Sequence, residues 1–257
     1  MFLTAVRKVL ITVVIVGYPA LVISLVAPEM PSTTSKLALI DRDGVINQDV
    51  GPPGVIDPAQ LKLTKDAGIA LGKLRRNGYK CALITNQSCV GKGLITEQDL
   101  GSIHERMHEL LVEEDPDARF DEIFYCISTK EDNDHRSKPN PGMIEEALQV
   151  YGAADTTSFD SIFFVGDTLT DLQAAASANV PTRILVETGY GHGIMRGNKA
   201  PTIDGAVKVV NENESNNVDL STITDNTSSG LPKASIFPFL YTKNFSSAIE
   251  YILSTNS

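Results

Sequence analysis

Two acidic residues follow an apolar run near the start of the chain. Residues 37–43 read LALIDRD, so Asp41 and Asp43 come directly after four apolar residues. Two carboxylates this close repel one another unless a cation or a shared proton intervenes. Carboxylate oxygens are ligands that Mg²⁺ prefers, and Mg²⁺ also accepts phosphate oxygens of a substrate. The pair therefore indicates a metal site that would shield an attacking carboxylate from an anionic substrate.

Alternating strand and helix patterns predict the sheet that positions these acids. The segment 37–41 and the runs YKCALIT, EIFYCI, SIFFVGD and TRILVE are apolar and β-branched, as buried strands are. Helices are expected between them, at about 64–76, 97–114, 140–151 and 170–178. Such alternation is typical of an α/β fold with a doubly wound parallel, Rossmann-like sheet and helices on both faces. The intervening segments leave no room for a cap domain.

Polar residues follow three of the predicted strands. Asp41 and Asp43 end the first, Thr85 follows CALI, and Asp167 follows FFVG. In an open parallel sheet, ligands bind in the crevice beyond the carboxyl ends of the strands. The three strands therefore deliver oxygen-bearing groups to one rim, and Asp167 completes a pocket suited to Mg²⁺.

Four motifs carry a family resemblance. DRDGVIN, ITNQS, KPNPGM and GDTLTD occur in this order, and together they resemble the motifs of the haloacid dehalogenase-like phosphatases over about residues 36–190. Within that superfamily they are most similar to the histidinol-phosphatase and D-glycero-D-manno-heptose 1,7-bisphosphate phosphatase group. The resemblance implies a Mg²⁺-dependent phosphomonoesterase without a cap domain. Its substrate would be a small polar phosphate ester, such as a sugar phosphate, a sugar bisphosphate or histidinol phosphate.

The resemblance also implies roles for the acids. Asp41 would be the nucleophile that forms an aspartyl-phosphate, and Asp43 would protonate the leaving alkoxide and then activate water. Asp167 would bind Mg²⁺ with the Asp41 carboxylate and the Asp43 main-chain carbonyl. Asp171, one helical turn on, would support these ligands without binding the metal itself.

Further residues are implied to bind the substrate. The Thr85 hydroxyl and the Asn86 backbone N–H would hold the phosphoryl oxygens, and Lys138 would neutralise their charge and that of Asp41. Lys92 would meet a distal phosphate or hydroxyl, and Arg136 belongs to the same substrate-binding set. Read singly, each of these residues could equally be a helix cap or a solvated surface residue. The joint pattern of four motifs favours the interpretation of these residues as part of an enzyme active site.

The sequence departs from the resembled group in two loops. Many members of that group carry a zinc loop before the KP motif, but here only Cys126 and His135 remain. Two ligands are too few for a structural zinc site, so no structural zinc is expected. Ser137 stands where an arginine commonly precedes the motif lysine, and Lys92 stands where an arginine is common. Lys92 would act as a point charge and not as a bidentate fork.

Three other functions compete with this hypothesis. HERMH at 104–108 matches the H-E-x-x-H zinc protease signature, but no third ligand follows in the expected context. A receiver domain also carries an acidic pocket, yet it needs no acid at the place of Asp43. Polynucleotide 3′-phosphatases share the TNQ and KP patterns. A formal net charge of -10 opposes binding to nucleic acid, so a small-molecule partner is expected.

The N-terminal part, 1–35, is expected to lie outside the enzyme domain at 36–190. Residues 9–27 carry no charge and follow Arg7 and Lys8, which favours a membrane anchor or signal segment. In that case the protein would be membrane-anchored or in the secretory pathway. A start at Met30 would instead leave a cytoplasmic protein.

The C-terminal part divides into two expected segments. Residues 191–232 are polar and rich in Asn, Ser and Thr, which predicts a mobile surface insertion. Residues 233–257 contain FSSAIEYILS, which predicts a closing segment with an amphipathic helix. Nothing in the sequence indicates the oligomeric state.

Overall fold

The computed structural model describes residues 36–153, 161–196, 198–201, 205–222 and 236–255. All described residues belong to one compact unit, 35–257. The expected anchor at 9–27 therefore lies outside the described residues. None of the helices in the described ranges is both long and apolar enough to cross a membrane.

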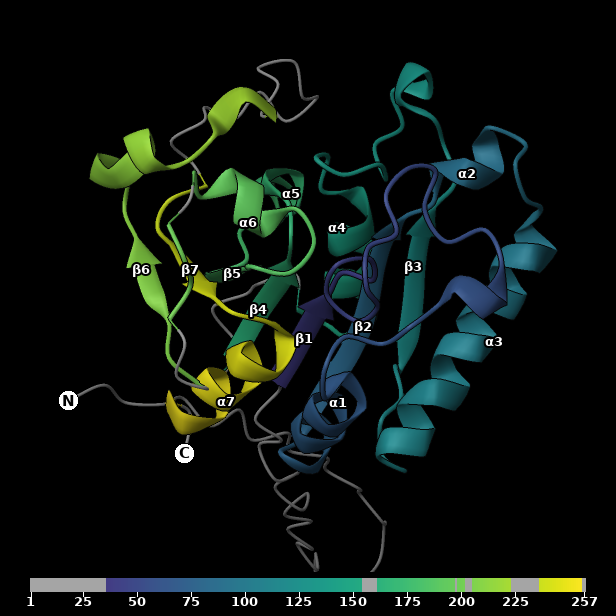
Figure 1. The fold of residues 1–257 in the computed structure, drawn as a ribbon, viewed down its shortest axis with the longest axis horizontal. Coiled ribbons are helices and arrows are strands. Elements are labelled where there is room, and N and C mark those ends of the chain that lie inside the picture. Colours follow the sequence, from purple (N-terminus) through teal and green to yellow (C-terminus); the bar gives the residue numbers. More distant parts are fainter. Residues whose placement is uncertain (1–35, 154–160, 197, 202–204, 223–235, 256–257) are drawn as a thin grey trace, which may run out of the picture. The chain divides into compact units, whose positions relative to one another are not determined.

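A central sheet carries the described fold, in the strand order β3-β2-β1-β4-β5-β7-β6 (Figure 1). All neighbouring strands run parallel except β6, which is antiparallel to β7. The strands are β1 (Lys36–Ile40), β2 (Tyr79–Asn86), β3 (Glu122–Cys126), β4 (Ser161–Gly166), β5 (Thr182–Val186), β6 (Lys208–Val210) and β7 (Phe239–Thr242). The parallel sheet confirms the predicted fold class.

Strand β1 is buried on both faces, which explains its unbroken apolar sequence. Its side chains alternate between two hydrophobic clusters. Ala38 and Ile40 belong to the cluster that includes residues of α1 (Ala67–Arg76), α3 (Glu97–Glu114) and α7 (Phe245–Thr255). Leu37 and Leu39 belong to the cluster that includes residues of α4 (Gly142–Val150) and α5 (Leu169–Ser177). Helices therefore cover both faces of the sheet, as predicted.

The connections between motifs contain no additional domain in the described residues. Between β1 and β2 lie a loop, the short 3₁₀ helix η1 (Pro58–Gln60) and α1. Between β2 and α4 lie α2 (Ser88–Gly91), α3, β3 and the 3₁₀ helix η2 (Lys130–Asp132). This agrees with the expectation that no cap domain is present.

The segment 191–232 differs from the surface insertion that we expected. Its described part contains α6 (Gly191–Ile194), β6 and the 3₁₀ helices η4 (Glu212–Asn217) and η5 (Leu220–Thr222). Met195, Val210 and Val218 are at most 1% exposed and pack in a third hydrophobic cluster with residues of α5, β5 and β7. These apolar residues are too irregularly spaced to predict an element. Val210 becomes buried because β6 pairs with β7, a strand distant in sequence.

Candidate active site

Three neighbouring strands bring the predicted polar residues together. β2, β1 and β4 are adjacent, and Thr85, Asp41 and Asp167 lie at or just after their carboxyl ends. They line a hollow of about 200 Å³, which we call the active-site hollow. Its other lining residues are Asp43, Asp49, Asn86, Lys138, Thr168, Thr170, Asp171 and Tyr190.

A larger hollow, of about 330 Å³, lies at the opposite end of the strands. It includes Ser161, Thr182 and Phe239, the first residues of β4, β5 and β7. None of its described lining residues is a carboxylate. The chemistry therefore belongs to the smaller hollow.

Asp41 is almost fully buried, with 7% of its surface exposed. Its backbone N–H donates to the Val165 carbonyl at 2.9 Å, which continues the pairing of β1 with β4. Burial raises the pKa of Asp41 to about 7, although the nearby Lys138 ammonium opposes the rise; Asp171 and Asp43 add to it. The negative charge of the Asp41 carboxylate is therefore only partly neutralised by Lys138, and a bound cation would stabilise it further.

Lys138 is the buried cation of the site. Its Nζ lies 2.7 Å from Asp41 Oδ1 and 2.6 Å from Asp171 Oδ1, and it donates to the Ile84 carbonyl at 3.0 Å. Burial lowers the pKa of Lys138, but the two carboxylates outweigh it and the net shift is upward. Lys138 is therefore charged at neutral pH and can neutralise a phosphoryl group beside Asp41.

Asn86 holds the backbone of Lys138 by two side-chain hydrogen bonds. Its Nδ2 donates to the Lys138 carbonyl at 3.0 Å, and its Oδ1 accepts from the Lys138 N–H at 3.1 Å. The family resemblance implies a role for the Asn86 backbone N–H alone, on phosphate oxygens. The side-chain role was not evident from the sequence because the two residues come from separate motifs.

Three buried carboxylates form the candidate metal site. Asp41, Asp167 and Asp171 each offer an oxygen, and these oxygens lie within 4.8 Å of one another. Burial raises the pKa of Asp167 well above its usual value, and the charges of Asp171 and Asp41 add to this effect. A hard divalent cation fits such a set, since it takes oxygen ligands and compensates clustered negative charge.

The hydrogen bonds of Asp171 agree with a supporting role. Its Oδ1 faces Lys138, while its Oδ2 accepts from Thr168 N at 3.0 Å and Thr168 Oγ1 at 2.6 Å, which caps α5. Asp167 uses Oδ2 to accept from the Tyr190 N–H at 2.9 Å. Both oxygens of Asp171 are therefore engaged by protein groups, whereas Asp167 retains one that can bind a metal.

Asp43 is held by groups that we did not single out from the sequence. Its carboxylate accepts from Arg42, from Asn47 Nδ2 at 2.9 Å and from Gln87 Nε2 at 3.0 Å. Burial raises the pKa of Asp43, but the Arg42 charge and these hydrogen bonds outweigh it and lower the pKa overall. Gln87 also donates to the Thr85 hydroxyl at 2.8 Å, which leaves the Thr85 proton free to face a substrate. Arg42 and Asn47 belong to the motif DRDGVIN, and Gln87 belongs to ITNQS. Their place in these motifs was the one indication in the sequence that they contact Asp43.

Comparison with known proteins agrees with this geometry. The family model for "Hydrolase: haloacid dehalogenase-like hydrolase" matches residues 15–179. The chain belongs to this family. The matched residues include the strands and motifs that form the active-site hollow, apart from Tyr190. The predicted family is therefore confirmed.

Individual relatives are similar over about three fifths of the chain. The D-glycero-D-manno-heptose-1,7-bisphosphate 7-phosphatase of Chlorobaculum tepidum is 33% identical over 166 residues, covering 61% of this chain and 81% of the relative. The D-glycero-beta-D-manno-heptose-1,7-bisphosphate 7-phosphatase of Neisseria meningitidis serogroup A is 36% identical over 159 residues, covering 61% and 79%.

A solved structure shows the same likeness in three dimensions. It is the D,D-heptose 1.7-bisphosphate phosphatase from B. bronchiseptica complexed with magnesium and phosphate, with a TM-score of 0.58 and 33% identity. The match covers 65% of this chain and 89% of that one. Together with the family model and the relatives, it confirms the prediction of a phosphoric monoester hydrolase.

Lys92 and Arg136 do not line the active-site hollow. Lys92 is exposed at the end of α2. Arg136 Nε lies 2.9 Å from the Glu146 carboxylate, an ion pair on the surface of α4. Their predicted contact with substrate stays a prediction, and Arg136 would have to leave Glu146 to make it.

The remnant of the zinc loop does not converge on a metal. Cys126 Sγ lies 3.6 Å from Asp134, whereas His135 Nε2 lies 2.8 Å from Glu145. Within the described ranges, the triad of Asp41, Asp167 and Asp171 alone has the spacing for a metal. His104 and His108 of the HERMH match form no such group there.

Proposed function

We propose that this chain is a Mg²⁺-dependent phosphomonoesterase that acts on a small polar phosphate ester through an aspartyl-phosphate on Asp41. The observation that carries the proposal is the contact of Asp41 with Lys138, 2.7 Å long, beside the buried carboxylates of Asp167 and Asp171. A nucleophilic carboxylate, a fixed cation and a metal-binding oxygen set are the parts that phosphoryl transfer needs.

In the first half-reaction, the Asp41 carboxylate attacks the phosphorus and the ester O–P bond breaks. Lys138 and the Thr85 hydroxyl stabilise the phosphoryl oxygens, since both line the hollow beside Asp41. Asp43 gives a proton to the leaving alkoxide. Mg²⁺ bound by Asp41, Asp167 and the Asp43 carbonyl would neutralise charge on the transferred group.

In the second half-reaction, water attacks the aspartyl-phosphate, and inorganic phosphate leaves. Asp43 takes the proton of this water, which requires the carboxylate form. Arg42, Asn47 and Gln87 favour that form because they lower the pKa of Asp43. Asp43 must therefore gain its proton with the substrate in place before it acts as the acid.

The hollow favours a small, hydroxyl-rich ester. Asp49, Thr170 and Tyr190 supply polar groups to its lining, and Tyr190 is 51% exposed. Lys138 is the one cation among the described lining residues. A sugar phosphate is therefore the favoured substrate, and the names of the relatives make a heptose bisphosphate the first bisphosphate to test. Lys92 would supply the charge for a second phosphate.

A substrate panel tests the proposal. The full chain with Mg²⁺ is assayed against sugar phosphates, sugar bisphosphates, histidinol phosphate and a 3′-phosphorylated oligonucleotide. We expect turnover of at least one small ester and none of the oligonucleotide. Asp41→Asn should abolish this turnover while the protein stays folded. Asp66→Asn is the control, because Asp66 is an N-cap whose side chain makes no cap hydrogen bond.

The result that would overturn the mechanism is near wild-type activity of Asp41→Asn with Mg²⁺. A second readout is phosphate incorporation from labelled substrate after an acid quench. The wild-type protein should retain label and the Asp41→Asn variant should not. Label on the variant would place the nucleophile elsewhere.

A further inference from the structure

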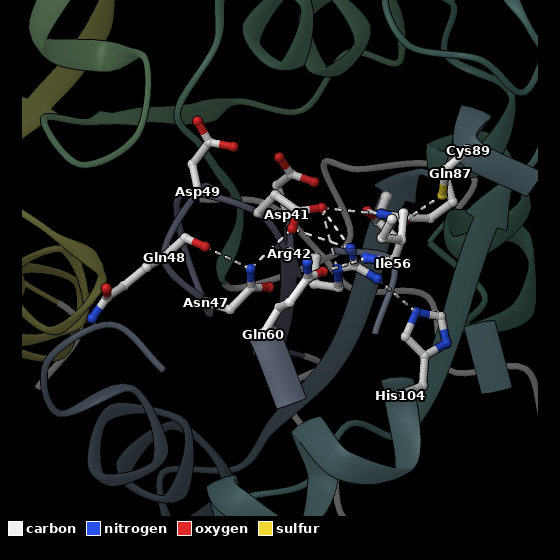
Figure 2. Close-up of polar contacts among 12 residues, drawn as sticks. Asp41, Arg42, Asn47, Gln48, Asp49, Ile56, Gln60, Gln87, Cys89 and His104 are labelled. Carbon is white, nitrogen blue, oxygen red and sulfur yellow. Dashed lines mark hydrogen bonds and ion pairs between the residues drawn. The ribbon is translucent and has the colours of Figure 1, made fainter. Parts of the chain in front are cut away.

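A histidine of the HERMH match contacts Arg42, the residue between Asp41 and Asp43. His104 lies on α3, and its Nε2 is 3.4 Å from Nη1 of Arg42. Arg42 is 0% exposed and stands between the two catalytic aspartates in the sequence. Figure 2 shows the Arg42 side chain reaching from the strand end toward the His104 ring. The mechanism proposed above uses neither residue as a reacting group.

The other end of the Arg42 guanidinium binds Asp43. Nε donates to Asp43 Oδ2 at 3.2 Å, and Nη2 donates to Oδ2 at 2.9 Å and to Oδ1 at 3.1 Å. The N–H groups of a guanidinium form a rigid planar fork, so fixing one side of it fixes the other. The position of His104 therefore restrains the direction in which Arg42 presents its hydrogen bonds to Asp43.

His104 is well placed to act as an acceptor. Burial lowers the pKa of His104 to about 4, and the Arg42 charge lowers it further than Asp43 raises it, so the ring is neutral near pH 7. A neutral imidazole has one acceptor nitrogen, which can accept from Nη1. The Tyr125 ring packs edge-on against His104, with 6.0 Å between centroids. The neighbouring Ile103 is fully buried in the core, which anchors this turn of α3.

We propose that His104 is a positioning residue of the phosphatase reaction, which holds the Arg42 fork so that Asp43 stands at the place of proton transfer. The proposal rests on the proposed function, because it needs Asp43 to be the proton donor. It assigns a role to the first histidine of HERMH and none to the second. His108 is exposed on α3, and the described residues show no hydrogen bond or ring contact between it and residues 41–43.

Two substrates separate positioning of Asp43 from a general structural effect. Glucose 6-phosphate has an alkoxide leaving group that needs a proton, whereas the leaving group of p-nitrophenyl phosphate does not. A positioned acid contributes typically 10²–10⁴-fold to rate. Partial misplacement of Asp43 should therefore lower kcat/KM, which reports the step in which the leaving group departs, by about 10–100-fold on glucose 6-phosphate. On p-nitrophenyl phosphate kcat/KM should change by less than about twofold.

The experiment compares three variants of the full chain with Mg²⁺. His104→Leu removes the acceptor, His104→Gln retains one of similar reach, and His108→Leu is the matched control in the same motif. We expect the selective loss for His104→Leu, its recovery to within about fivefold of wild type for His104→Gln, and wild-type rates for His108→Leu. An equal loss on both substrates, or none, in His104→Leu overturns the proposal while Asp41→Asn still tests the reaction itself.

A spectroscopic measurement on the wild-type protein is independent of how the variants fold. The ¹⁵N chemical shifts of His104 should show an Nε2 without hydrogen at pH 7 and a hydrogen on Nδ1. A hydrogen on Nε2, or a charged ring, would overturn the proposal, since neither can accept from Arg42. If the wild-type protein does not hydrolyse glucose 6-phosphate, the alkyl ester that it turns over in the substrate panel takes its place. If it turns over no ester of that panel, the proposed function fails and this inference falls with it.

Discussion

Lys138 Nζ lies between two carboxylates, 2.7 Å from Asp41 and 2.6 Å from Asp171. Asp167 is the third carboxylate of the same group. When all three carboxylates are ionised, the Lys138 ammonium neutralises one of their charges. The two negative charges that remain would be neutralised by one divalent cation. Lys138 is therefore the permanent cation of the site. The metal would neutralise the remaining negative charge and could also bind the substrate.

Replacing this lysine should affect both activity and stability. Lys138→Met is expected to lower kcat by about 10²–10³-fold, as the loss of a group that stabilises transition-state charge does. Breaking a buried pair on one side costs about 3–5 kcal/mol, so the free energy of unfolding without metal should fall by this order at pH 8. Urea unfolding with EDTA measures the loss, and added Mg²⁺ should recover part of it.

The matched control is Lys73→Met. Lys73 pairs with Glu250 across α1 and α7, but both side chains are more than 40% exposed. Exposed ion pairs contribute about 0–1 kcal/mol, so this variant should keep wild-type kcat and nearly wild-type stability. If Lys138→Met were as harmless as Lys73→Met, Lys138 would not be the central charge of the site.

The raised pKa of Asp41 predicts how stability depends on pH. The folded protein holds a proton on Asp41 up to about pH 7, whereas the unfolded chain releases it near 3.8. Between these values the folded state binds more protons, so the free energy of unfolding should decrease as pH rises. Asp167 is shifted in the same direction. Asp43 has a lowered pKa, so its effect falls below 3.8 and outside this window. His104, whose pKa is lowered from 6.5 to about 4, has the opposite effect between these two values. Its single proton is outweighed by the protons that Asp41 and Asp167 retain in the folded protein.

Mg²⁺ should counteract this decrease because it binds the deprotonated carboxylates. Its apparent affinity should rise between pH 5 and pH 8, with protons released on binding. Calorimetry in two buffers of different ionisation enthalpy measures the protons. Urea unfolding at both pH values, with EDTA or with Mg²⁺, measures the stability. A metal-free protein that becomes more stable across this range would contradict the prediction.

Gly189 should be required for the position of Asp167. Its φ is +61°, and a Cβ at this residue would overlap the Asp167 carboxylate. We expect Gly189→Ala to weaken Mg²⁺ binding and to lower kcat/KM by at least about tenfold, since a misplacement of 1 Å can cost this much. Gly152→Ala is the control, because Gly152 has a similar φ of +70° and no atoms within 4 Å. It should lose about 1–2 kcal/mol of stability and keep its activity.

Asp134 should stabilise the loop that precedes Lys138. Its carboxylate accepts from Ser128 Oγ at 2.5 Å and from the Arg136 N–H at 2.8 Å, shortly before Lys138. Asp134→Ala should therefore lower the free energy of unfolding by about 1–3 kcal/mol. Asp132→Ala, at an exposed 3₁₀ turn, should cost at most about 1 kcal/mol.

The same loop predicts indifference to zinc. Dialysis of the wild-type protein against a zinc chelator, followed by Mg²⁺, should leave both activity and melting temperature unchanged. The physical reason is that the Cys126 thiol and the His135 ring are engaged by Asp134 and Glu145 separately. Loss of folding on zinc removal would show that the two do converge on a metal.

Local patterns were enough to predict much of the fold. The helix expected at 97–114 is α3, Glu97–Glu114, because Thr96 and Asp99 form a capping box and the apolar residues repeat at helical spacing. The rim of acids was predictable for a similar reason. A strand that is buried on both faces is an unbroken apolar run, so the residue that ends it is visible in the sequence.

The sequence by itself determined the fold class, the family and the residues that meet at the carboxyl ends of β1, β2 and β4, because these follow from short-range periodicity and motifs. Only the tertiary structure decided which partner each of them has. Asn86 binds the backbone of Lys138, and His104 reaches Arg42 over 62 positions of the chain. Such contacts depend on how separate elements pack, and no local pattern encodes them.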